Sequence, residues 1–157
     1  MGCFLLTVVE MLKKKLGINA IERKKFASSY FKIPPTLNIP KGCEKIGLGA
    51  FYGCSRLEKV VIPKSVVDIG VSAFEDCKNL RDVVIPGSVE RIRNYAFKGC
   101  VKLEKVIIPE SVEMIGYEAF WRCEITLEKP ESEFKFISPD AFSGCKNVTY
   151  AKEKVRN

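Results

Sequence analysis

The sequence predicts an α/β solenoid, a right-handed coil of about five repeats with parallel strands and a capping helix at its N-terminal end. The first observation is that the dipeptide Ile-Pro recurs at a constant spacing of 23 residues, at positions 39–40, 62–63, 85–86 and 108–109. The second is that Ala-Phe recurs in phase with Ile-Pro, and a cysteine follows each alanine after four residues, at Cys54, Cys77, Cys100, Cys123 and Cys145. The third is a stripe of apolar residues at helical spacing ahead of the repeats.

Each repeat is expected to contribute one strand, followed by a second short extended stretch and a tight turn that carries Ala-Phe. In the segment LEKVVIP the proline removes a backbone donor and ends the strand. Because one strand cannot bury its apolar face alone, successive coils must stack as a parallel sheet around columns of valine, isoleucine and phenylalanine. The cysteine column is expected to be buried and reduced, since parallel side chains that all point inward have the wrong mutual direction for a disulfide.

The chain is expected to divide into an N-terminal cap over residues 1–33 and a solenoid of these repeats over residues 34–157, which ends in an irregular capping repeat. The cap is predicted to be helical over residues 3–16, where the apolar residues lie on one face and Gly17 follows. It is also basic, with seven Lys and Arg against two Glu. No signal peptide is expected, since the segment lacks a basic start and a small-residue cleavage site.

Composition excludes most catalytic chemistry. The chain of 157 residues has globular proportions, with 46% apolar and 29% charged residues. It contains no histidine, so it cannot form a Ser-His or Cys-His nucleophilic pair or a His-ligated zinc site. It contains neither a Cys-x-x-Cys pair nor a phosphate-binding glycine loop. We therefore expect no enzyme activity and no catalytic, cofactor-binding or metal-ligating residues.

The repeat unit resembles the BspA-like class of leucine-rich repeats, whose pattern is similar to LxxVxIPxSVxxIGxxAFxxCxxL. The match covers about residues 34–150, and it lacks the asparagine column of commoner leucine-rich repeats, using cysteine there. The third repeat departs from the pattern with Ile92-Arg93 in place of Ile-Gly. Members of this family look like surface or secreted adhesion and interaction proteins of oral and gut bacteria and of parasitic protists, so the resemblance implies binding rather than catalysis.

Two groups of outward residues are candidates for partner binding. The first is an apolar ladder on the sheet expected to be concave, formed by Val61, Val84 and Ile107. The second is an aromatic cluster on the rim near the C-terminal end, formed by Tyr95, Tyr117 and Trp121. The flanking columns alternate in charge, as in Lys59, Asp82 and Lys105, which favours register control over binding of one strongly charged partner.

The leading hypothesis is a non-catalytic protein-protein interaction or adhesion module that binds through its concave face and rim. The alternative is that the basic N-terminal segment contacts a membrane surface or nucleic acid, with the repeats as scaffold. The expected partner is a protein, and neither nucleic acid nor a membrane is expected, because the concave columns alternate in sign. The sequence leaves the oligomeric state and the location open: the missing secretion signal indicates the cytoplasm, whereas the resemblance indicates the cell surface or secretion.

Overall fold

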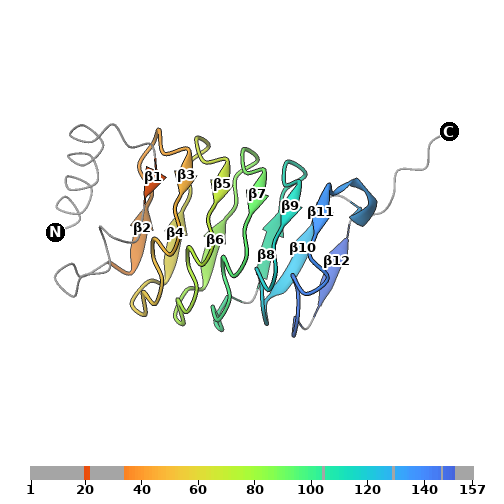
Figure 1. Ribbon diagram of the computed structural model, residues 1–157. Coiled ribbons are helices and arrows are strands. Elements are labelled where there is room, and N and C mark those ends of the chain that lie inside the picture. Colours follow the sequence, from red (N-terminus) through yellow and green to blue (C-terminus); the bar gives the residue numbers. More distant parts are fainter. Residues whose placement is uncertain (1–19, 22–33, 104, 129, 146, 151–157) are drawn as a thin grey trace.

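The computed structural model describes residues 20–21, 34–103, 105–128, 130–145 and 147–150. Short parallel strands stack one coil after another along a single axis, from β1 to β12 (Figure 1). The strands are β1 (Ala20–Ile21), β2 (Thr36–Asn38), β3 (Lys45–Ile46), β4 (Lys59–Val61), β5 (Asp68–Ile69), β6 (Asp82–Val84), β7 (Arg91–Ile92), β8 (Lys105–Ile108), β9 (Met114–Ile115), β10 (Glu124–Leu127), β11 (Phe136–Ile137) and β12 (Val148–Tyr150). A 3-10 turn, η2 (Glu131–Glu133), lies between β10 and β11.

Each coil has two strands, where the sequence predicts one strand and an extended stretch. The strands at the four Ile-Pro dipeptides, together with β10 and β12, form what we call face I, which consists of two sheets, β2-β4-β6 and β8-β10-β12. The extended stretches pair as well, into one six-stranded sheet, β1-β3-β5-β7-β9-β11, which we call face II. They pair because the 23-residue repeat places each stretch directly over the next, as Asp68 over Arg91. The solenoid of about five coils is confirmed, with a second sheet that the sequence did not reveal.

The part of the chain that the structure describes contains no α-helix, so it is built from strands and turns. The capping helix predicted over residues 3–16 lies outside the described residues. The predicted boundary between residues 33 and 34 stays a prediction, although β1 already pairs with β3 in face II.

The core between the two faces consists of columns of like residues. Phe51, Phe74, Phe97 and Phe120 are fully buried, and consecutive rings stack with centroids 5.2 Å apart. Such offset stacking adds to the area that each ring buries. The serine of the repeated Ser-Val pair has a separate role: Ser88 donates a hydrogen bond of 2.7 Å to the carbonyl of Val66 in the preceding coil, and Ser111 does the same to Val89 at 2.8 Å. Core and bonded serines together hold adjacent coils in register.

The third side of each coil, which we call the turn side, is the tight turn carrying Ala-Phe and cysteine. The turn has two positions with positive φ in most coils, and one of them is occupied by Gly53, Asp76, Gly99, Arg122 and Gly144 in successive coils. Glycine adopts this left-handed conformation freely, whereas asparagine, aspartate and larger residues do so at a cost. The stacked backbone, in which Gly53 donates a hydrogen bond of 2.8 Å to the carbonyl of Glu75, imposes the conformation on every coil.

Candidate functional site

The predicted apolar ladder lies on face I and points outward. Val61, Val84 and Ile107 are 42%, 66% and 48% exposed, respectively. Val61 and Val84 are direct neighbours in the β4–β6 register, whereas Ile107 belongs to the second sheet of this face. The structure therefore places all three side chains on one face but divides them between two sheets.

The division of face I opens a hollow at its centre. Among the described residues, no strand pairing joins β6 to β8, while both pair regularly on their other sides. The hollow has a volume of about 450 Å³, and its lining combines ladder side chains with two carboxylates: Asp82, Val83, Val84, Ile85, Ile107, Pro109 and Glu128. A space of this size, walled mainly by aliphatic groups, is suited to an apolar side chain of a partner.

The charged columns beside the ladder pair across coils, as the alternation of sign predicts. The Nζ of Lys59 lies 2.5 Å from a carboxylate oxygen of Asp82, its neighbour in the β4–β6 register. Both side chains are half-exposed, so this pair adds little stability and mainly favours the correct register.

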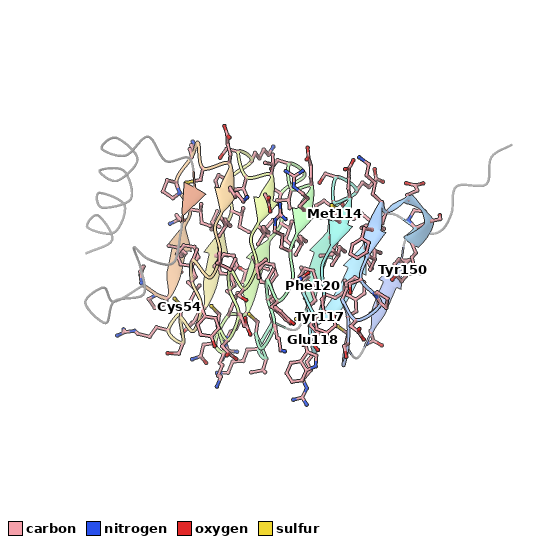
Figure 2. All side chains as sticks on the ribbon, in the orientation of Figure 1. Cys54, Met114, Tyr117, Glu118, Phe120 and Tyr150 are labelled. Carbon is pink, nitrogen blue, oxygen red and sulfur yellow. The ribbon has the colours of Figure 1, made fainter. Side chains whose placement is uncertain are left out.

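The predicted aromatic rim lies on the turn side, and the structure divides it into two parts. The rings of Tyr95 and Tyr117 meet edge to face, with centroids 5.5 Å apart. The Nζ of Lys98 lies 4.9 Å from the centroid of Tyr95 and 2.5 Å from a carboxylate oxygen of Glu118. A hydrogen bond to Glu118 raises the pKa of the Tyr117 hydroxyl, and the charge of Glu118 adds to the effect. Figure 2 shows Tyr117 and Glu118 at the lower edge of the stack.

Trp121 forms the other part of the rim. The guanidinium carbon of Arg122 lies 4.0 Å from the centroid of the Trp121 ring, and the indole nitrogen lies beside Gly144 of the next coil. The contacts of the described residues thus join Tyr95 to Tyr117 and place Trp121 with Arg122, rather than joining all three aromatics in one cluster. In both parts a cation of the chain itself covers an aromatic ring.

A charged cluster on face II is the feature that sequence reasoning missed. The Asp68 side chain is only 5% exposed, and Arg93 donates hydrogen bonds to both of its oxygens, at 2.8 and 2.7 Å. Lys45 and Arg91, from the coils on either side, each approach Asp68 to 3.5 Å. Burial alone would raise the pKa of Asp68, but the hydrogen bonds and charge of Arg93, with the charges of Lys45 and Arg91, hold this pKa below its usual range.

Arg93 occupies the position at which the neighbouring coils have glycine. A Cβ placed at Gly70 would lie 2.5 Å from the carbonyl oxygen of Ile46, so the corner after face II normally excludes a side chain. The backbone N–H of Arg93 nevertheless donates a hydrogen bond of 2.9 Å to the carbonyl of Ile69, as the N–H of Gly70 does to Ile46 in the preceding coil. Two residues 25 positions apart in the sequence signal this cluster. Asp68 is the one acidic residue at its position of the repeat among the described coils, and Arg93 stands where the coils on either side have Gly70 and Gly116.

The cysteine column is free of disulfides. All six cysteines of the described residues are free thiols, and three members of the column are buried: Cys77, Cys100 and Cys123. The end members Cys54 and Cys145 are only partly buried, which corrects the prediction that the whole column is buried. Burial raises the pKa of Cys123 to about 12, with a further contribution from Cys145.

The described residues contain no group of three or more metal-ligating side chains. They also include no helix with the length and apolar character needed to cross a bilayer.

A family model matches most of the chain, over the residues that form the stacked coils. Residues 19–149 match the BspA type leucine rich repeat region, in six copies. The chain belongs to the BspA-type leucine-rich-repeat family.

Three solved structures of leucine-rich-repeat proteins resemble this chain. A leucine-rich repeat protein from Bacteroides ovatus is 32% identical with a TM-score of 0.65, and the match covers 73% of this chain and 33% of that one. A leucine rich cell surface protein from Faecalibacterium prausnitzii is 32% identical with a TM-score of 0.68, covering 76% and 33%. The leucine rich repeat protein of T. pallidum is 30% identical with a TM-score of 0.67, covering 75% and 59%. The chain thus spans about a third of the length of the first two.

Among proteins with curated descriptions, none matches this chain.

Proposed function

We propose that this BspA-type chain is a non-catalytic module that binds another protein through face I and the adjoining turn side. The observation that carries the proposal is the exposed apolar ladder of Val61, Val84 and Ile107, two of whose members, Val84 and Ile107, line a hollow between the two sheets of face I. Exposed apolar residues that line a hollow and are rimmed by charges are typical of protein interaction sites.

The size of face I explains why the turn side takes part. The six strands of face I, each three or four residues long, give an area of roughly 300 Å² at about 4.8 Å between strands and about 3.3 Å per residue. A standard interface covers about 800 Å² per partner. A partner of ordinary size therefore contacts more than the ladder. The turn side is the nearest further surface, because in each coil the turn connects the face II strand to the next face I strand. There it offers Tyr95, Tyr117 and Trp121, residue types enriched in binding hot spots.

The likeness to a leucine rich cell surface protein from Faecalibacterium prausnitzii supports a role at the cell surface. A surface protein that binds another protein is an adhesion or recognition module, which agrees with the expectation from the sequence. The basic N-terminal segment, the alternative site for a membrane or nucleic acid, lies outside the described residues apart from β1.

Photo-crosslinking tests this proposal. A benzoylphenylalanine is introduced in place of Val84 on face I, and in a second protein in place of Met114, an exposed residue of β9 on face II. Both proteins are exposed to the native environment of the chain and irradiated, and the adducts are identified by mass spectrometry. We expect one defined protein adduct from position 84 and not from position 114. Equal adducts from both positions, or adducts from position 114 alone, would contradict binding through face I.

A further inference from the structure

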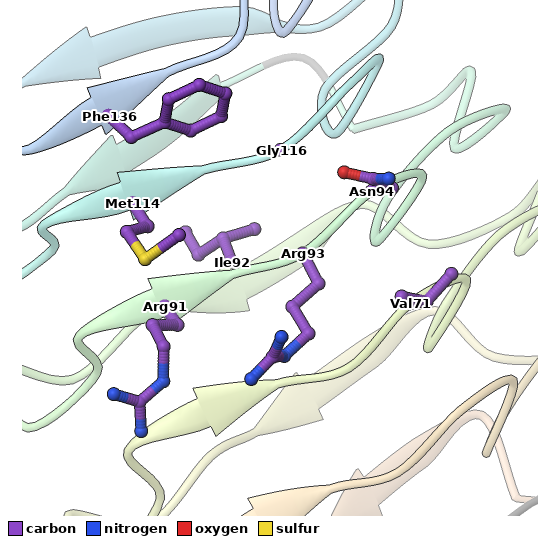
Figure 3. A pocket seen from close by; sticks show the side chains of 8 residues that line it. All are labelled: Val71, Arg91, Ile92, Arg93, Asn94, Met114, Gly116 and Phe136. Atoms are coloured by element: carbon purple, nitrogen blue, oxygen red, sulfur yellow. The ribbon is translucent and has the colours of Figure 1, made fainter.

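The charges of face II are largely matched within the chain. Figure 3 shows Arg91 and Arg93, which border a hollow of about 140 Å³ beside β7, extending toward β5. There they approach Asp68 to 3.5 and 2.7 Å, respectively. In the last two coils the Nζ of Lys135 lies 2.7 Å from a carboxylate oxygen of Glu113. Charges that are paired in this way give no reason to infer a charged partner for face II.

The remaining side of the solenoid has a different charge pattern. We call it the proline side: it is the corner that follows each Ile-Pro and connects a face I strand to the next face II strand, and in the last coil it is η2. The corners stack in register, because a serine hydroxyl in one corner donates a hydrogen bond to a carbonyl of the corner before, as Ser65 does to Cys43 at 2.8 Å. The proline side therefore presents its outward residues as columns with one residue per coil.

The residue that follows the proline forms one such column, and its charge reverses along the solenoid. It is basic in the first two coils, uncharged in the third and acidic in the last two: Lys41, Lys64, Gly87, Glu110 and Glu131. All five residues are exposed. In the part of the chain that the structure describes, the side chains of Lys64 and Glu110 have neither an ion pair nor a hydrogen bond. These two charges are therefore available to a partner.

This column is complementary to itself when two copies of the chain lie antiparallel. A two-fold axis through Gly87 places Lys64 opposite Glu110 of the second copy, and Lys41 opposite Glu131 of the second copy, each pair twice. The coil spacing of about 4.8 Å is the same in both copies, so the two columns align over their length of about 19 Å. In a parallel arrangement like charges would meet instead.

The neighbouring column has the same symmetry with the signs exchanged. It consists of the residues that precede the face II strands, and it begins with Glu44 and ends with Lys135. Antiparallel copies therefore place Glu44 opposite Lys135, a weaker contact because Lys135 also pairs with Glu113 of its own chain. Glu90, at the middle of this column, is paired with Arg91 at 3.2 Å, which limits its repulsion of the same residue in the second copy.

The centre of the proline side permits close approach but offers little area. A Cβ placed at Gly87 would meet nothing within 4 Å, so two copies meet at the axis with no side chain between them. A corner of four residues is about 10 Å across, which gives the proline side roughly 200 Å². Because a standard interface covers about 800 Å² per partner, contact through this side alone is weak.

We propose that the proline side pairs two copies of this chain in an antiparallel, two-fold-symmetric dimer with Lys64 and Glu110 in contact across the interface. Charge complementarity sets the orientation, and the small area gives a Kd of about 1 mM. The dimer uses neither face I nor the turn side, so this inference goes beyond the proposed function and does not depend on it.

Charge reversal at the two positions tests the pairing. In Lys64→Glu, and separately in Glu110→Lys, both central pairs become like-charge pairs, so each variant alone should self-associate at least about fivefold more weakly than the wild-type chain. When the two variants are mixed, a dimer with one copy of each again has opposite charges in both pairs. We therefore expect amide shifts of ¹⁵N-labelled Lys64→Glu at residues 64–65, 87–88 and 110–111 when unlabelled Glu110→Lys is added, and not when unlabelled Lys64→Glu is added.

Two further variants serve as controls. Lys78→Glu makes the same change of charge at an exposed lysine of the turn side, and it should leave the concentration dependence of the wild-type shifts unchanged. The double variant Lys64→Glu/Glu110→Lys keeps the net charge and should self-associate as the wild type does. Urea unfolding of each variant confirms that the fold is kept.

Three results would overturn the proposal. They are amide shifts of the wild-type chain that do not change with protein concentration, a Lys64→Glu chain that self-associates as strongly as the wild type, and mixed variants that associate no more strongly than either alone. Concentration-dependent shifts confined to face I would assign self-association to that face and would equally contradict a dimer through the proline side.

Discussion

Asp68 is the residue on which face II depends most. Its carboxylate is buried and accepts hydrogen bonds from Arg93, with Lys45 and Arg91 nearby. We expect Asp68→Asn to lower the free energy of unfolding by about 2 kcal/mol at pH 7, less than for a fully buried pair because the three cations are partly exposed. The control is Asp82→Asn, whose carboxylate is half-exposed, with an expected loss below about 1 kcal/mol. Equal losses in urea unfolding would contradict the assignment.

The Asp68–Arg93 pair makes stability depend on pH. The pKa of Asp68 in the folded protein is below its usual value, whereas in the unfolded chain it is about 3.9. The stabilisation is therefore complete above that value and is lost as the pH falls through the lower, folded pKa. The difference in stability between wild type and Asp68→Asn should shrink below about pH 4, and a difference that persists unchanged at pH 2 would argue against a charged Asp68.

The cysteine column predicts a graded reactivity. The thiols of Cys77, Cys100 and Cys123 are buried, and Cys77 and Cys100 each donate a hydrogen bond of 3.1 Å to a phenylalanine carbonyl. With N-ethylmaleimide at pH 8, Cys54 and Cys145 should be labelled first and the three interior thiols only on unfolding, because the reagent reaches a partly buried sulfur more readily than a fully buried one. Mass spectrometry of tryptic peptides gives the order. Early labelling of Cys100 would show that the coils separate locally.

At the scale of the element, the corner after β3, β5 and β9 of face II is a glycine, and at Gly70 the preceding coil leaves no room for a side chain. A Cβ at Gly70 would meet the Ile46 carbonyl at 2.5 Å, whereas a Cβ at Gly87 would meet nothing within 4 Å. We expect Gly70→Ala to cost about 2 to 3 kcal/mol by forcing adjacent coils apart. Gly87→Ala should change stability by less than about 1 kcal/mol. Thermal unfolding of the two variants side by side decides this, and a Gly70→Ala protein as stable as wild type would refute the close approach.

The elements differ in how well the sequence predicts them. The face I strands follow from the alternation that ends at each Ile-Pro, and the buried columns follow from the constant spacing. The face II strands are only two residues long in each coil, too short for alternation to distinguish a paired strand from an extended loop. The Asp68–Arg93 pair is two residues out of phase with the repeat, so a comparison of equivalent positions does not reveal it.

The candidate site was predictable only in part. The outward direction of Val61, Val84 and Ile107 follows from strand alternation. The hollow beside them does not, because the repeat unit is similar at every junction and gives no reason for β6 and β8 to separate. The split of the rim arises because Trp121 lies beside Gly144 of the next coil, a contact that depends on how the turns stack.

For the whole molecule, the small area of face I predicts weak binding by one copy. Roughly 300 Å² of sheet is less than half of a standard interface per partner. Two copies joined by a flexible linker should therefore bind a partner displayed at high density at least about tenfold more tightly than one copy. Surface plasmon resonance at two partner densities measures this gain. Equal apparent affinities at high density would mean that the single chain already forms a complete interface.

The most direct test of the central claim, that face I is the protein-binding surface, is the affinity of two variants for the purified crosslinked partner. Val84→Lys and Met114→Lys introduce the same charge at exposed positions, of which only the first lies on face I. In isothermal titration calorimetry we expect Val84→Lys to raise Kd at least about tenfold, or about 1.4 kcal/mol, and Met114→Lys to leave it unchanged. A Kd that is unchanged in Val84→Lys, or raised equally in both variants, would contradict the claim.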